Sequence, residues 1–157
     1  GASMIRTIFT ASILATASPA AAQVMPGIEI GQTKAEAIDV FGGHGAAPIT
    51  GQPGAEIATR PDGHVTFCNG RVTSIQRKVG TNLHAFTDMV GDLTRDHGEP
   101  IYTTGHYRAS TGEISTLDAR WDYPDDQRRY AISMIYSGST LDVTETISLL
   151  NGERCGF

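Results

Sequence analysis

Five histidines are the residues of this chain best suited to acid–base or metal chemistry. They are His44, His64, His84, His97 and His106. None of them stands in a zinc-binding spacing, such as two histidines on adjacent helical turns or an HExxH motif. His64 and Cys68 are four residues apart, but in an extended strand that spacing separates them by about 13 Å. We therefore predict no metal site and no cofactor.

Catalytic motifs are equally scarce. Asp96 and His97 are adjacent, but neighbouring residues of a helix do not face each other, and His97 would suit a helix C-terminus instead. The sequence contains no GxSxG motif, no phosphate-binding loop and no dinucleotide-binding fingerprint. We predict no catalytic residues, and the first interpretation is a protein that is not an enzyme.

The two cysteines, Cys68 and Cys155, predict a disulfide. In an oxidising compartment an even number of cysteines is typical of disulfide pairing. A bridge that closes so long a loop contributes about 4 kcal/mol in the chain-entropy model. Two independent thiols are the alternative interpretation.

Four charged residues form the best candidate for a binding surface. They are Asp118, Arg120, Asp122 and Arg129. They alternate with apolar residues in two neighbouring segments, and the turn between the segments puts Asp122 directly opposite Arg129. The alternative is cross-strand charge pairing on a solvated face, which contributes about 0.2–1 kcal/mol per pair.

Hydrophobic spacing predicts the elements that position these residues. We predict helices over 33–41, beginning with a Thr33–Glu36 capping box, and over 83–97. Short strands are predicted at 56–60, 64–68 and 71–78, and longer ones at 101–109, 116–123, 128–136 and 141–150. The segment 45–54 is predicted to be a loop.

Strand register follows from the turns. The Asn69-Gly70 hairpin puts Phe67 opposite Val72 and Cys68 opposite Arg71, and Ile75 joins the apolar face only if a bulge intervenes. The longer strands separate apolar from polar side chains, which is typical of an antiparallel sheet with one face on a core and one in water. Glu145 falls on the apolar face, so we expect it at a sheet margin.

The order helix, three strands, helix, four strands looks like a diverged repeat. We predict an α+β fold of two diverged helix-plus-antiparallel-meander units, about 31–79 and 82–150, with the helices packed on one face of the sheet. Together they would form a single α+β domain over residues 23–157.

Two motifs resemble a known superfamily: Gly31-Gln32-Thr33-Lys34-x-Glu36 at the first helix, and Val65-x-Phe67-x-Asn69-Gly70-Arg71-Val72 in the hairpin. They are similar to the G-x-T-x-x-E and (D/N)-G-R-V patterns of the β-lactamase-inhibitor-protein-like superfamily, which includes small envelope proteins of the SmpA/OmlA (BamE) type. The similarity covers residues 31–77, and no lipid-attachment cysteine follows the apolar leader. The resemblance implies a non-enzymatic exported domain that binds another protein with an exposed sheet face.

Residues 1–22 have the pattern of a tag scar followed by a signal peptide. The scar Gly1-Ala2-Ser3 precedes Met4, and Arg6 precedes the uncharged run 7–17 and the small residues Ala20-Ala21-Ala22. We expect a periplasmic or secreted protein. The apolar run is shorter than the roughly 20 residues that cross a bilayer, so no membrane span is expected. The net charge of −5 also argues against nucleic acid as a partner.

These observations predict an exported, non-enzymatic protein-binding module, inhibitor-like or envelope-assembly-like, that uses an exposed sheet face. Its partner would be another periplasmic or envelope protein. The alternative is a small periplasmic hydrolase or small-ligand-binding protein that uses histidine and aspartate residues. That alternative predicts a pocket holding a histidine and a carboxylate with shifted pKa values. A self-associating structural protein of the envelope is a third interpretation.

Overall fold

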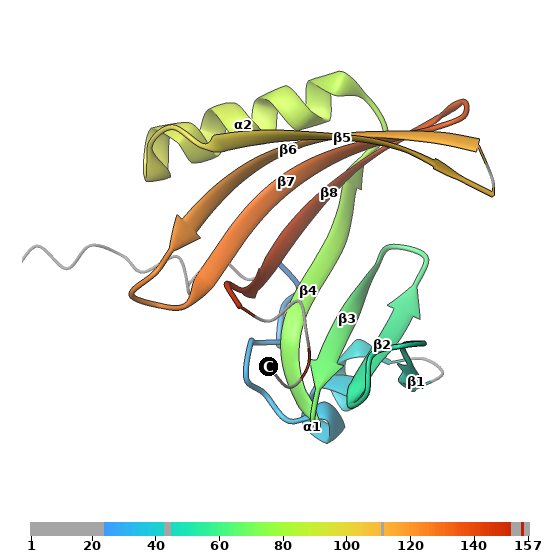
Figure 1. Cartoon of the computed structure of the whole chain (residues 1–157). Helices are drawn as coiled ribbons and strands as arrows, with labels where there is room; N and C mark the ends of the chain where they lie inside the picture. Colours follow the sequence, from blue (N-terminus) through green and yellow to red (C-terminus); the bar gives the residue numbers. More distant parts are fainter. Residues whose placement is uncertain (1–23, 43–44, 111, 152–154, 156–157) are drawn as a thin grey trace, which may run out of the picture.

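The computed structural model describes residues 24–42, 45–110, 112–151 and 155. The expected tag scar and signal peptide at 1–22, and His44, lie outside these described residues. The described strands form one antiparallel sheet in the order β1-β2-β3-β4-β8-β7-β6-β5 (Figure 1). The strands are β1 (Ala47–Pro48), β2 (Ala55–Arg60), β3 (Gly63–Cys68), β4 (Arg71–Gly80), β5 (Ile101–Ala109), β6 (Gly112–Tyr123), β7 (Arg128–Ser137) and β8 (Thr140–Leu149), and the helices are α1 (Lys34–Phe41) and α2 (Leu83–His97).

The strands of the two predicted units join into one sheet, so the predicted fold class is wrong. We expected two helix-plus-meander units, but β4 pairs with β8 and the sheet has eight strands. Strands make up 52% of the described residues and helices 18%, so the sheet dominates the fold. The physical reason is that β4 and β8 each run for ten residues. Long edges expose unpaired backbone groups, and pairing the last strand of each meander satisfies both edges.

The helices start where the sequence predicts. The capping box of Thr33 and Glu36 is present at α1, and the Asn82 side chain accepts a hydrogen bond from the backbone N–H of Ala85 at α2. Each helix buries only two residues, Ala37 and Phe41 in α1 and Phe86 and Val90 in α2. Most of the hydrophobic cluster therefore comes from the sheet.

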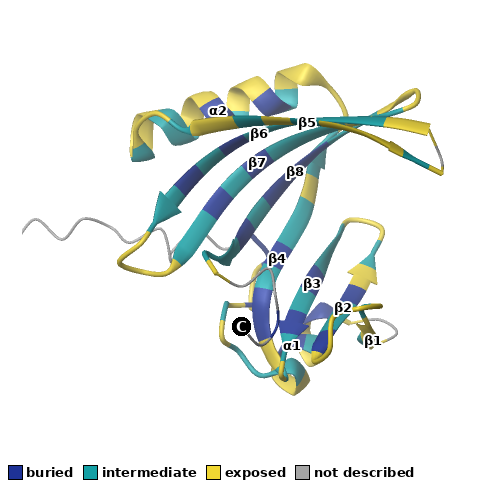
Figure 2. Ribbon diagram, viewed as in Figure 1, coloured by how far each residue is buried: buried dark blue, intermediate teal, exposed yellow. Residues whose placement is uncertain are grey.

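One row of paired residues carries the core across six strands. It consists of Trp121, Tyr130, Ile147, Ile75, Val65 and Ala58. None of these residues is more than 5% exposed. Figure 2 shows the same alternation of buried and partly buried residues along the central strands. The predicted separation of an apolar and a polar face is therefore confirmed.

The β3–β4 hairpin has the predicted register. Phe67 lies opposite Val72 and Cys68 opposite Arg71, and the register shifts between Thr66 and Phe67. This bulge brings Ile75 opposite Val65, as the apolar pattern requires. The predicted loop 45–54 is partly wrong, because Ala47–Pro48 pairs with β2 as a two-residue strand.

Glu145 is in the interior of the sheet, where we had expected a margin. It pairs with Ile132 on β7 and with Arg77 on β4, and it is 7% exposed. The Arg77 guanidinium donates to Glu145 Oε2 at 2.5 Å, and the Tyr130 hydroxyl donates to Glu145 Oε1. A buried carboxylate needs such partners, so this cluster links the two sequence regions at the β4–β8 seam.

The first described residues belong to the core. Val24, Met25 and Ile28 are at most 5% exposed and join the hydrophobic cluster. The described helices are too short or too polar to cross a membrane.

Candidate binding face

One face of the sheet carries polar side chains across five central strands. We call it the polar face, and it consists of Thr66, Ser74, Gln76, Lys78, Asp118, Arg120, Asp122, Arg129, Ser133, Asp142, Thr144, Thr146 and Ser148. The register places these residues opposite one another, so Arg129 pairs with Ser148, Ser148 with Ser74, and Ser74 with Thr66. The buried residues of both helices instead join the cluster on the other face.

The structure brings three of the four predicted site residues together. The Arg129 guanidinium donates two hydrogen bonds to the Asp122 carboxylate, from Nε to Oδ1 at 2.7 Å and from Nη2 to Oδ2 at 3.3 Å. Arg120 Nε lies 3.8 Å from Asp122 Oδ2. The prediction that Asp122 lies opposite Arg129 is confirmed. Asp118 precedes Asp122 by four residues on β6 and pairs with Ser133, so it lies outside this cluster.

Arg120 makes a longer contact with Asp122 than Arg129 does. Its side chain is 30% exposed, and its Nε is shielded from solvent without a hydrogen-bond partner in the described residues. On the neighbouring strand β7 its paired residue is Ala131, whose methyl side chain cannot form a hydrogen bond with Arg120. Two guanidinium groups therefore share one Asp122 carboxylate, and the cluster retains capacity for an added acidic group.

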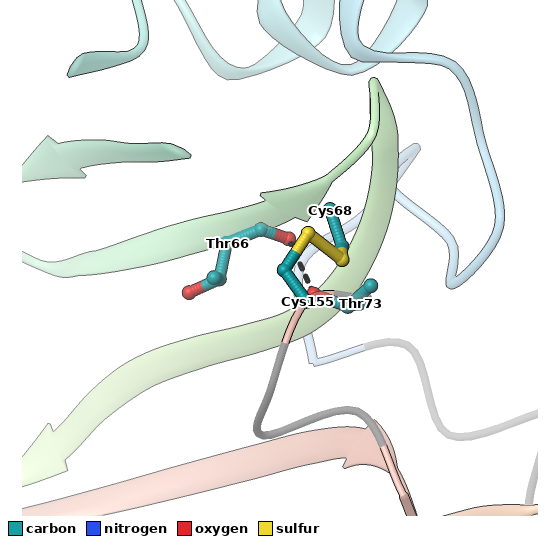
Figure 3. Close-up of a disulfide and its surroundings, with 4 residues drawn as sticks. All are labelled: Thr66, Cys68, Thr73 and Cys155. Atoms are coloured by element: carbon teal, nitrogen blue, oxygen red, sulfur yellow. Dashed lines mark hydrogen bonds between the residues drawn. A yellow bond between two sulfur atoms is a disulfide. The ribbon is translucent and has the colours of Figure 1, made fainter. Parts of the chain in front are cut away.

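A hydroxyl-rich pocket opens beside the disulfide at the β3–β4 end of the sheet. Its volume is about 300 Å³, and its lining includes Gln52, Thr66, Thr73, Ser74, Thr146 and Ser148 together with Cys68 and Cys155. The disulfide between these cysteines confirms the pairing that the sequence predicts. In Figure 3 the sulfur bridge lies next to Thr66 and Thr73, and the Thr73 hydroxyl donates to the carbonyl of Thr66 at 3.2 Å.

No protein-family model, characterised protein or solved structure matches this chain. Function must therefore be inferred from the geometry of the polar face and its surroundings.

The four described histidines lie on three elements, β3, β5 and α2. His64 is on β3, His106 is on β5 with Nδ1 2.9 Å from Ser115 Oγ, and His97 stacks edge-on against Tyr123 at the end of α2. His84 pairs with Asp88 at 3.3 Å, with both side chains largely exposed. In the described part of the chain, no three metal-ligating residues gather into a site.

Burial is the leading cause of a shifted pKa at two residues of the sheet, His64 on β3 and Tyr123 on β6. Burial lowers the pKa of His64 below its usual value of 6.5, because the charged imidazolium loses hydration. Burial likewise raises the pKa of the Tyr123 hydroxyl above 10. Neither His64 nor Tyr123 lines the hydroxyl-rich pocket.

Sequence reasoning missed the pocket. The pocket depends on a loop residue, Gln52, and on the C-terminal Cys155 meeting the strands, which strand patterns alone do not indicate. The available signal was the disulfide itself, which fixes the C-terminal segment against β3. The Thr66–Phe67 bulge was a second signal, since bulges redirect side chains locally.

Proposed function

We propose that this chain is an exported, non-enzymatic protein-binding module that recognises an acidic segment of another envelope or periplasmic protein through the polar face. The observation that carries the proposal is the Arg120–Asp122–Arg129 cluster on a sheet face that the helices leave uncovered. The resemblance of residues 31–77 to β-lactamase-inhibitor-like and SmpA/OmlA-type proteins supports the same reading, as do the leader and the disulfide.

The chemistry favours a carboxylate as the partner group. A guanidinium binds a carboxylate through parallel N–H donors, and such charge-assisted bonds are about twice as strong as neutral ones. Arg129 is already held by Asp122, which fixes its position and leaves Arg120 as the adaptable contact. Ala131 separates Arg120 from Thr146, so a side chain of the partner has room between them.

A photo-crosslinking amino acid at Ala131 tests the proposal. The variant is expressed in the native host and irradiated, and the crosslinked protein is identified by mass spectrometry. The same probe at Thr87, an exposed residue of α2, is the matched control. We expect a partner captured from Ala131 and not from Thr87. Adding Arg120→Ala to the variant that carries the probe at position 131 should reduce the crosslinking yield at least about tenfold. This magnitude follows if the lost charge-assisted hydrogen bond contributes about 1.5 kcal/mol or more to binding.

The control for charge is Arg95→Ala, which removes an equally cationic side chain from the exposed Arg95–Asp92 pair on α2. It should leave the yield unchanged. Equal crosslinking from Ala131 and Thr87, or insensitivity to Arg120→Ala, contradicts recognition by the polar face.

A small neutral ligand is a second candidate, because the pocket beside the disulfide reaches the lower size limit of small-molecule sites. Its hydroxyl and amide groups, beside the apolar Ile49, Ala55 and Phe67, would suit a polyhydroxyl compound. Ligand-observed NMR with a panel of neutral monosaccharides tests this, with Ser148→Val inside the pocket and Ser133→Val outside it as the matched pair. Binding that survives Ser148→Val would contradict a site in this pocket.

A further inference from the structure

The outer edge of β5 is open. In the described part of the chain, no strand pairs with β5 on the side away from β6. The strand is nine residues long, contains no proline and carries one full charge, on Arg108. Ile101, Tyr102 and Tyr107 are 50%, 54% and 54% exposed, and Figure 2 shows most of β5 as exposed.

The opposite edge of the sheet is protected. There the outermost strand is β1, which has two residues, one of them Pro48. A short edge with a proline offers few backbone donors, whereas a long edge without proline or dense charge is a template for another strand. The two edges therefore differ in the property that controls strand addition.

We propose that β5 pairs with β5 of a second copy of this chain, antiparallel about a two-fold axis through Gly105. The joined sheets would then form one continuous sheet across the dimer. This goes beyond the proposed recognition by the polar face, since it uses an edge and a different set of residues.

Strand geometry restricts the register of such a pair. Directly opposed residues in an antiparallel pair point to the same face, while adjacent residues point to opposite faces. A two-fold axis must therefore pass through one residue paired with itself. An axis at Gly105 pairs all nine residues. An axis at Thr104 would bring Pro100 into the ladder, and an axis at His106 would place two histidines together.

The Gly105 register also brings compatible side chains together. Tyr102 falls opposite Arg108 of the other copy, a cation over an aromatic ring, and this contact occurs twice. Thr103 falls opposite Tyr107, and Ile101 opposite Ala109. Because Arg108 is the one fully charged side chain of the strand, no like charges meet across the interface.

Sedimentation velocity over a concentration series tests the proposal with the purified chain. One strand per copy makes a small interface, so the series should reach millimolar protein. We expect a monomer–dimer equilibrium. Tyr102→Arg places two arginines opposite each other twice and should weaken dimerisation by about tenfold to thirtyfold.

Two further variants separate this register from other causes. Tyr136→Arg makes the same change at an equally exposed tyrosine on interior strand β7, and it should leave the equilibrium unchanged. The exchanged variant Tyr102→Arg with Arg108→Tyr restores the opposition of arginine and tyrosine, and it should recover the dimer. A monomer at every concentration overturns the proposal. A dimer whose dissociation constant is unchanged by Tyr102→Arg also overturns it. The same holds if the exchanged variant remains monomeric while circular dichroism shows a native fold.

Discussion

Replacing Arg77 with methionine should destabilise the protein through the carboxylate that it leaves behind. The Glu145 side chain is 9% exposed and that of Arg77 is 43% exposed. Breaking a fully buried pair costs about 3–5 kcal/mol, while an exposed pair contributes about 0.2–1 kcal/mol. With one partner buried and the other half-exposed, we expect a loss of about 2 kcal/mol. The Tyr130 hydroxyl bond to Glu145 remains and limits the loss.

Urea unfolding followed by the fluorescence of Trp121 measures this loss, because Trp121 is the single tryptophan and is 5% exposed. A double-mutant cycle of Arg77→Met with Glu145→Gln isolates the interaction, since the second change removes the charge that would be left unpaired. We expect a coupling energy of about 1 kcal/mol or more. Arg95→Met is the control, because its partner Asp92 is 72% exposed and the pair should contribute little.

A coupling energy near zero between Arg77 and Glu145 would refute the reasoning, because the cycle would then show that the two side chains do not stabilise each other.

Three other predictions concern single features of the structure. Burial lowers the pKa of His64, so as pH falls the unfolded state takes up a proton at a higher pH than the folded state does. Stability should therefore fall as pH drops through 6.5 and below. Urea unfolding at a series of pH values should show a smaller pH dependence of stability for His64→Gln. Replacing Cys68 and Cys155 with serine should remove up to about 4 kcal/mol of stability, and reductant should lower the urea midpoint of the natural chain but not of this variant. Asp122→Asn should cost about 1 kcal/mol by thermal unfolding, because Arg129 and Asp122 are each about one-quarter exposed.

The sequence predicted local structure well because local structure depends on neighbouring residues. Capping at Thr33, the Asn69-Gly70 register and the opposition of Asp122 and Arg129 each involve turns or caps a few residues long. The bulge near Phe67 was also predictable, because Ile75 would otherwise face water. These features need no knowledge of which distant strands meet.

Long-range pairing was not predictable in the same way. The β4–β8 seam joins residues about 70 positions apart, such as Gln76 and Thr146, and nothing near either residue specifies the other. Glu145 was a signal of this pairing that we misread. A carboxylate on an apolar face indicates either a sheet margin or a buried cationic partner, and Arg77 is that partner only because the seam exists. The pocket beside the disulfide depends on the same long-range assembly.

The seam that overturned the predicted fold also extends the proposed binding face from β6 and β7 to the β3–β4 region. If β4 and β8 did not pair, the hydroxyls of the β3–β4 region and the arginines of β6 and β7 would lie on separate sheets. With the seam in place, Arg129, Ser148, Ser74 and Thr66 form one cross-strand row that joins the charge cluster to the pocket. The two meanders thus share one continuous surface. It follows that loss of the Arg77–Glu145 contact should weaken partner recognition as well as stability, although neither residue lies on the polar face.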